Sequence, residues 1–235
     1  MGKVAIATDS NSGIKKSEAE KLGIFSLPMP VIIDEVICYE GVDLTQEMFY
    51  SSLTGGKEVS TSQPSPGEVM GMWDEILAKG YDEIVHIPMS SGLSNSCESA
   101  ISLASDYDGK VEVADNHRIS VTLRESVLEA KGLSDRGMSA KEIKKELEAR
   151  AYEASIYIAV DTLEFLKKGG RVTPAAAALG AVLNIKPVLT IQGERLDAFA
   201  KVRGMKKCKH KMLEALKNDL ATRFKDVDMS QIVIG

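Results

Sequence analysis

Cysteine is scarce in this chain of 235 residues, and its three copies are scattered. Cys38, Cys97 and Cys208 lie far apart, and no CxxC pair occurs. Disulfide-stabilised small domains and zinc sites place their cysteines in close pairs, so neither kind of protein is indicated. Isolated cysteines are usual in a reducing compartment, and we therefore expect a cytoplasmic protein.

The chain also lacks long apolar runs and any excess of positive charge. No stretch approaches the roughly 18 apolar residues that a membrane-spanning helix needs, and residues 1–7 resemble a strand rather than a signal peptide. The formal net charge is −5. Because nucleic acids and anionic membranes bind electropositive faces, this negative charge argues against a nucleic-acid partner. The lack of a long apolar run argues against a membrane span.

Several catalytic motifs are missing. Neither the GxxxxGK[ST] phosphate loop nor the GxGxxG dinucleotide loop occurs. The segment 92–96, Gly-Leu-Ser-Asn-Ser, departs from the GxSxG nucleophile elbow of serine hydrolases. His, Cys and acidic residues nowhere show the spacing of a metal site. The sequence therefore predicts no catalytic residue, no metal and no cofactor.

The few candidate catalytic side chains have simpler interpretations. His86 lies in an apolar run and His210 in a lysine-rich helical pattern, so both are expected to be structural or surface residues. His117 follows a polar loop without an obvious partner acid. Asp9 follows the first predicted strand, but Asn11 stands where aspartyl-phosphate phosphatases usually carry a second Asp. A capping or turn role for Asp9 is favoured.

What the sequence does contain is an alternation of short apolar runs and helical patterns. The predicted strands are Val4–Thr8, Pro30–Ile33, Glu83–Pro88, Lys110–Ala114, Ala154–Val160, Pro187–Ile191 and Gln231–Ile234. The predicted helices are Pro66–Lys79, Ser120–Leu133, Ser139–Tyr152 and Lys206–Phe224. This order favours an α/β fold with a mainly parallel sheet and flanking helices. Segments 15–40 and 172–186 do not fit the alternation and suggest that the sheet is mixed.

A change of character near Ser155 predicts two lobes. A charged helical pattern ends there and a new apolar strand begins. We expect an N-terminal α/β lobe over residues 1–154 and a second mixed α/β lobe over residues 155–235.

A serine-rich turn follows the predicted strand 83–88. It carries Ser90, Ser91, Gly92, Ser94 and Ser96, which are expected at the end of that strand and in the first turn of the next helix. Ligands of open α/β sheets bind at that edge, and the free N–H groups of a helix start suit an anion. Ordinary helix capping is the competing interpretation, since Ser is common at N-caps.

A second hydroxyl-rich turn precedes the predicted helix 66–79. Ser65, Pro66 and Glu68 have the form of a capping box with proline at the first helical position. This assigns Ser65 to structure and leaves Thr61 and Ser62 available to face a ligand.

Two arginines stand out in the second half of the chain. Arg171 follows a glycine pair, and Arg203 ends the run Lys201-Val202-Arg203. A guanidinium group suits a carboxylate or a phosphate, although for each arginine taken alone a solvated charge or an internal salt bridge is the favoured explanation.

Taken in order, these segments resemble the DegV family of bacterial fatty-acid-binding proteins. The matching segments are 8–10, 61–65, 90–94, 163–171, 183–187 and 201–203, which span nearly the whole chain. The resemblance implies a two-lobed α/β fold that encloses a long-chain fatty acid and holds its carboxylate between the lobes. It also implies that some members present the fatty acid to a separate fatty acid kinase for acyl-phosphate formation and phospholipid synthesis.

The resemblance also implies roles for particular residues. Thr61 and a serine of the second turn, Ser91, would hydrogen-bond the carboxylate, with Ser62, Gly92 and Ser94 as their neighbours in the site. Arg171 would lie at the head group and Arg203 on the surface that faces the kinase. In the family a further segment follows the strand that matches 231–235 and contributes a head-group histidine. No residues follow that match here, so we expect either that the chain has been cut short or that it closes its pocket differently.

Three hypotheses follow. The first is a carrier that binds a fatty acid non-covalently and performs no chemistry on it. The second is an enzyme that acts on a phosphorylated or acylated small molecule, with Ser91 or Asp9 as nucleophile. The third is a regulatory module for which the lipid is a signal.

Overall fold

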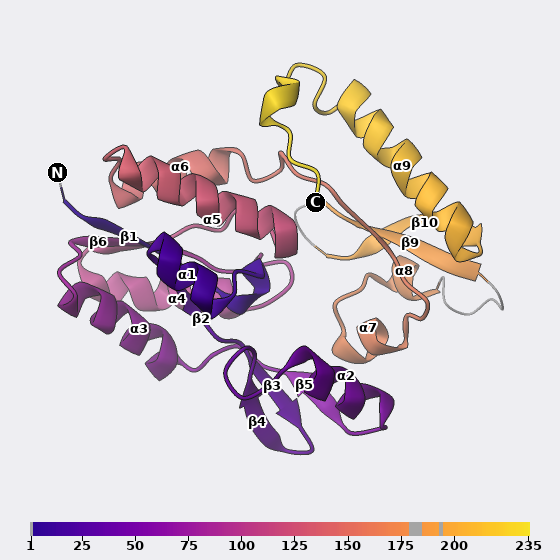
Figure 1. The fold of residues 1–235 in the computed structure, drawn as a ribbon, viewed down its shortest axis with the longest axis horizontal. Helices are drawn as coiled ribbons and strands as arrows, with labels where there is room; N and C mark the ends of the chain where they lie inside the picture. The colour runs from indigo at the N-terminus through magenta and orange to yellow at the C-terminus, as the bar shows by residue number, and fades with distance from the viewer. Residues whose placement is uncertain (1, 179–184, 193–194) are drawn as a thin grey trace. The chain divides into compact units, whose positions relative to one another are not determined.

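A four-stranded parallel sheet organises the first part of the chain in the computed structural model, which describes residues 2–178, 185–192 and 195–235 (Figure 1). The chain divides into two compact units, Met1–Ala151 and Tyr152–Gly235. The predicted lobe boundary, between residues 154 and 155, falls three residues further along.

The parallel sheet has the strand order β2-β1-β6-β7. Its strands are β1 (Val4–Asp9), β2 (Ile24–Leu27), β6 (Glu83–Ile87) and β7 (Val111–Val113). The helices that pack against this sheet are α1 (Lys16–Leu22), α3 (Pro66–Ala78), α4 (Ser96–Ala104), α5 (Ser120–Asp135) and α6 (Ala140–Ala149). Parallel strands need such crossover connections, and the predicted α/β fold class is confirmed.

Alternate residues of the central strands supply two apolar cores, one on each face of the sheet. Val4 and Ile6 of β1 face the core formed with α1, α5 and α6, whereas Ala5 and Ala7 face the core formed with α3 and α4. Trp73 of α3 is fully buried in the second core. Because both faces are covered, the central strand β1 is apolar at consecutive residues from Val4 to Ala7 rather than alternating in polarity.

Segment 15–40 does not add strands to one mixed sheet, as the sequence suggested. Only β2 joins the parallel sheet, while β3 (Pro30–Ile33) and β4 (Val36–Tyr39) pair with β5 (Val59–Thr61) in a separate antiparallel sheet of order β4-β3-β5. The helix α2 (Gln46–Thr54) lies between β4 and β5 in the chain. A short hairpin can only pair antiparallel, which explains why these strands form their own sheet.

The second unit contains an antiparallel sheet of order β10-β9-β8. Its strands are β8 (Ile156–Ala159), β9 (Ile185–Ile191) and β10 (Asp197–Arg203), and its helices are α7 (Glu164–Gly169), α8 (Pro174–Ala178) and α9 (Met205–Ala221). Helix α9 contacts all three strands.

The predicted strand 231–234 is wrong. A short 3₁₀ helix covers Met229–Gln231, and the residues after it form no regular structure. Val233 and Ile234 are exposed and pair with no strand among the described residues. An apolar run becomes a strand only where an edge is present to accept it.

The capping box predicted at the start of α3 is confirmed. Ser65 Oγ accepts the N–H of Glu68 at 3.3 Å, and the Glu68 carboxylate accepts the N–H of Ser65 at 2.7 Å.

In the part of the chain that the structure describes, no helix has both the length and the apolar content needed to cross a bilayer.

Candidate ligand-binding site

The serine turn lies at the carboxyl end of β6, as predicted, but it is not the first turn of a helix. Residues 90–94 form a separate turn, and α4 begins only at Ser96. The turn shares this edge of the sheet with the residues that follow β1 and β7, because the three strands run parallel and side by side.

The backbone N–H groups of the serine turn are already bonded within the protein. Those of Leu93 and Ser94 both donate to the carbonyl of Ser90, at 3.0 and 3.2 Å. The N–H of Ser90 donates to the carbonyl of Arg118 at 2.9 Å, and that of Gly92 to Ser90 Oγ at 3.2 Å. The expectation that free N–H groups of this turn would bind an anion is therefore wrong.

The hydroxyl groups of the turn differ in what remains available. Ser90 is fully buried and its Oγ accepts the N–H of Gly92, while Ser94 Oγ accepts the N–H of Ser96 at 3.2 Å. Ser91 is half-buried, and its hydroxyl bonds to none of the described residues. Ser91 can thus offer a ligand both a rotatable donor and acceptor lone pairs, whereas Ser94 Oγ already accepts an N–H and has only its O–H left to donate.

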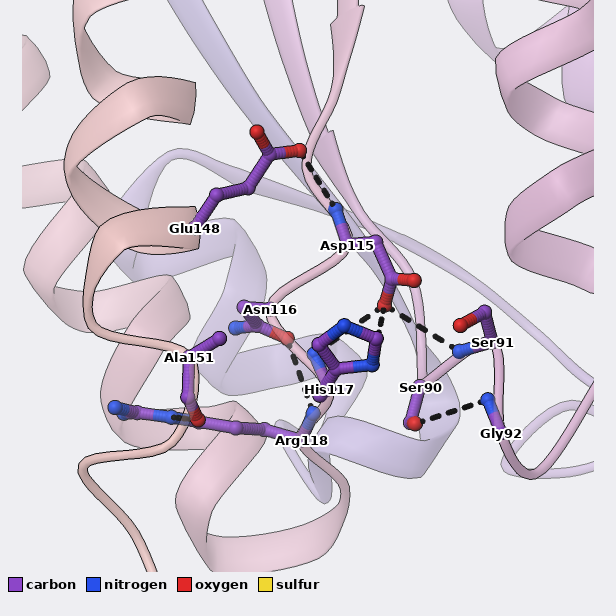
Figure 2. A network of polar contacts seen from close by, with 9 residues as sticks. All are labelled: Ser90, Ser91, Gly92, Asp115, Asn116, His117, Arg118, Glu148 and Ala151. Atoms are coloured by element: carbon purple, nitrogen blue, oxygen red, sulfur yellow. Dashed lines mark hydrogen bonds and ion pairs between the residues drawn. The ribbon is translucent and has the colours of Figure 1, made fainter. Parts of the chain in front are cut away.

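Asp115, which follows β7, is a site residue that the sequence analysis missed. One carboxylate oxygen, Oδ1, accepts the N–H of Ser91 at 3.4 Å and the N–H of His117 at 3.2 Å (Figure 2). The same oxygen lies 3.6 Å from Nδ1 of His117, so this histidine does have a partner acid. The signal was available, since Asp115 closely follows a strand that is parallel to β6.

The loop after β7 is fastened to the end of α6. The guanidinium of Arg118 donates to the carbonyls of Arg150 at 2.6 Å and Ala151 at 3.4 Å, and to Ser126 Oγ at 3.0 Å. The C-terminal carbonyls of a helix have no intrahelical partners, so a cation that binds them stabilises both elements.

Asp9 serves as a structural acceptor, which agrees with its predicted capping role. Its Oδ2 accepts the N–H of Met89 at 2.9 Å, and its Oδ1 accepts both the N–H and the side-chain amide of Asn11 at 2.9 Å. Burial raises the pKa of this carboxyl group, while these hydrogen bonds oppose the rise. A buried carboxylate with both oxygens occupied is poorly placed to act as a nucleophile.

Thr61 is the last residue of β5 and is exposed, and Ser62 follows it. Ser62 donates its hydroxyl to the carbonyl of Gln63 at 3.0 Å, so this hydroxyl is partly used locally. Ser99 Oγ in the first turn of α4 donates to Gln63 Oε1 at 3.4 Å. That bond joins the loop after Thr61 to the helix that follows the serine turn.

The two predicted arginines lie in the second unit and are exposed. Arg171 donates to the carbonyl of Gly169 two residues earlier, and Arg203 ends β10. Neither forms an ion pair with any residue that the structure describes. Residues 183 and 184 of the predicted segment 183–187 lie outside the described residues. The predicted contact of Arg171 with a ligand held by the first unit, and that of Arg203 with a kinase, stay predictions.

The other histidines have the structural roles that were expected. His86 is buried on β6 with its ring 5.6 Å from the Trp73 ring, and burial lowers its pKa to about 4. His210 is exposed on α9 and lies 3.2 Å from Glu214.

The described residues contain no group of three His, Cys, Asp or Glu side chains that could hold a metal ion.

The sequence and the fold both match known proteins. A family model described as "Uncharacterised protein, DegV family" matches residues 3–229. A DegV domain-containing protein of Deinococcus radiodurans is 37% identical over 205 residues, which cover 87% of this chain and 73% of the relative.

Two solved structures show the same fold. A DegV family protein from Thermus thermophilus, described as binding fatty acid, is 32% identical with a TM-score of 0.83, over 92% of this chain and 77% of that one. A stearic-acid-binding protein from Eubacterium ventriosum is 26% identical with a TM-score of 0.84, over 96% and 79%. The length and specificity of these matches show that the chain belongs to the DegV family.

Proposed function

We propose that this protein binds a long-chain fatty acid non-covalently and that the Ser91 hydroxyl donates a hydrogen bond to its carboxylate. The observation that carries the proposal is that Ser91, at the carboxyl edge of the parallel sheet, has a half-buried hydroxyl that bonds to none of the described residues. Related structures described as fatty-acid-binding proteins support it.

The energetics suit a ligand with one small polar end and a long apolar remainder. A hydroxyl is a neutral donor, and a hydrogen bond to a charged group contributes about 1.5–3 kcal/mol. Burying a chain gains roughly 0.8 kcal/mol per methylene. The acyl chain would therefore supply most of the affinity, while Ser91 selects for the acidic head.

The remaining predicted residues take supporting roles in this proposal. Thr61 would supply a second hydroxyl with Ser62 beside it, and Arg171 would add a positive charge at the head group. Gly92 and Ser94 would act by shaping the turn, because both are bonded inside it.

In this proposal the protein is a cytoplasmic carrier that requires no cofactor and presents its fatty acid to a fatty acid kinase. Arg203 would then contact the kinase. Its exposure at the end of β10, without an ion pair among the described residues, supports a role on the surface.

The test is the lipid content of the purified protein. Mass spectrometry of denatured wild-type protein should find an acyl chain, and added palmitate or oleate should raise the Tm. Ser91→Ala should weaken fatty acid binding by about tenfold, because it removes one hydrogen bond to a charged group. Ser102→Ala, an exposed serine on α4, is the matched control and should bind like wild type. Wild-type protein with neither bound lipid nor a thermal shift would contradict the proposal.

The second candidate is an acyl-transfer enzyme with Ser91 as nucleophile. The pairing of His117 with Asp115 beside the serine turn favours it, because an oriented imidazole is the usual base for a serine. A covalent acyl adduct on Ser91 would support this candidate, whereas full turnover by Ser91→Ala would remove it.

A further inference from the structure

The loop between β7 and α5, residues 114–119, holds the serine turn from one side. Two of its groups accept N–H groups of neighbouring turn residues: the carbonyl of Arg118 accepts that of Ser90, and Asp115 Oδ1 accepts that of Ser91. These bonds span about 25 residues of sequence, so the position of Ser91 depends on a remote segment (Figure 2). The Asp115 side chain is only 17% exposed, which limits competition from water.

The backbone of this loop is held in an unfavourable conformation. His117 within the loop has φ of +52°, and Ser120, the first residue of α5, has φ of +56°, both in the left-handed region that residues other than glycine seldom adopt. Such strain persists only where surrounding contacts enforce it, and it is concentrated at functional sites. Here the enforcing contacts are the Arg118 bonds to the end of α6 and the Asp115 bond to the N–H of His117.

Asp115 is itself held from the opposite side. Its backbone N–H donates to Glu148 Oε1 of α6 at 3.3 Å, so the backbone at Asp115 cannot move away from α6 without losing this bond. Its carboxylate contributes two hydrogen bonds through one oxygen, and both orient backbone rather than a ligand.

We propose that Asp115 is the positioning residue of the fatty acid site: it fixes the backbone at Ser91 and so aims the Ser91 hydroxyl at the carboxylate. This inference rests on the proposed function, since it assigns a role within the same site. Asp115 acts through Ser91, so removing either residue should remove most of what the other contributes.

A double-mutant cycle with palmitate as the probe tests this role. Palmitate affinity is measured for wild type, Ser91→Ala, Asp115→Ala and the double variant. Asp115→Ala should weaken binding by about tenfold in the wild-type background and by less than about threefold in the Ser91→Ala background. Asp115→Asn keeps an oxygen acceptor and should retain affinity within about threefold of wild type.

Amide hydrogen exchange measures the contact directly and does not depend on Asp115→Ala folding. In Asp115→Asn, the weaker neutral acceptor should speed exchange at Ser91 and His117, while amides in the strands of the same sheet keep their protection.

The outcomes separate this inference from the proposed function. If wild type does not bind palmitate, the proposed function fails first. If wild type binds and Asp115→Ala has the same effect in both backgrounds, or none, Asp115 does not act through Ser91. Tighter binding by Asp115→Asn would mean that repulsion between two carboxylates outweighs positioning. Either of the last two results would overturn the inference.

Discussion

At the scale of single residues, the most unusual group is His86. Its ring is buried in the core formed with α3 and α4, and neither ring nitrogen has a hydrogen-bond partner among the described residues. A protonated imidazole in that position would be an unpaired buried charge, which explains why burial lowers the pKa to about 4. His86 therefore behaves as a core aromatic residue at neutral pH.

This predicts a specific acid sensitivity. The unfolded chain takes up a proton on His86 near pH 6.5, but the folded protein does so only near pH 4. The contribution of neutral His86 to the free energy of unfolding is therefore fully present above pH 6.5 and is lost as the pH falls towards 4. The loss from this one group is at most roughly 3 kcal/mol. His86→Leu should reduce the loss of unfolding free energy between pH 6.5 and pH 4. At pH 7 it should change the free energy of unfolding by less than about 1.5 kcal/mol, because no hydrogen bond is removed.

Urea unfolding at pH 7 and pH 4.5 measures the effect. His210→Ala removes an exposed histidine and is the matched control, which should keep the acid dependence of wild type. An unchanged difference between the two pH values in His86→Leu would show that His86 is not responsible.

At the scale of elements, helix starts show how local sequence sets structure. The starts of α3 and α6 both carry a complete capping box, Ser65 with Glu68 and Ser139 with Glu142. In each, hydrogen bonding by the serine lowers the pKa of the glutamate. These contacts are local in sequence, and for that reason the boundary at Pro66 was predictable.

Ser65→Ala should lower the free energy of unfolding by about 1 kcal/mol, since the N–H of Glu68 at the start of α3 loses its acceptor. Ser139→Ala repeats the change on α6 and should have a similar effect. Ser102→Ala, on an exposed face of α4, should change stability by less than about 0.5 kcal/mol. Chemical denaturation of the three variants is the measurement, and a Ser65→Ala protein as stable as Ser102→Ala would contradict the capping role.

At the scale of the whole molecule, charge is divided unevenly between the two units. Of the 29 Lys and Arg residues, 14 lie in residues 152–235, against 9 of the 34 Asp and Glu residues, so this part carries +5 and the rest −10. Oppositely charged surfaces steer association, so an acidic partner would approach the second unit, which contains Arg203.

For the proposed kinase partner, Arg203→Ala should reduce phosphoryl transfer to bound fatty acid by at least about tenfold and leave the lipid content unchanged. Lys201→Ala, an exposed cation two residues earlier on β10, is the matched control and should have a smaller effect. Phosphoryl transfer by the kinase and mass spectrometry of bound lipid are measured on the same samples. Equal losses of transfer and of lipid would show that Arg203 serves the fatty acid rather than the partner.

Much of the fold could be predicted because its signals are local. Strand β3 was predicted with its exact bounds, and β1, β6 and α3 to within one residue, from apolar runs and caps. Strands β2, β4 and β5 were not predicted, because short strands are specified largely by their partners. The same reason explains why 231–234, although apolar, is not a strand.

The candidate site was predictable in part. The serine turn and its place at the edge of the sheet follow from β6 and the hydroxyl-rich segment after it. The sequence did not show which group of the turn remains available, because Arg118 and Asp115, in a loop about 25 residues away, accept N–H groups of the turn.

The sequence by itself determined the α/β class, the helix caps and the hydroxyl-rich turns, because each depends on residues within one or two turns of chain. Only the tertiary structure decided that the N–H groups of the turn are bonded within the protein, that Ser91 Oγ bonds to none of the described residues, and that Asp115 Oδ1 accepts the N–H of Ser91. These depend on which strand ends lie side by side, and that arrangement is set by packing on both faces of the sheet.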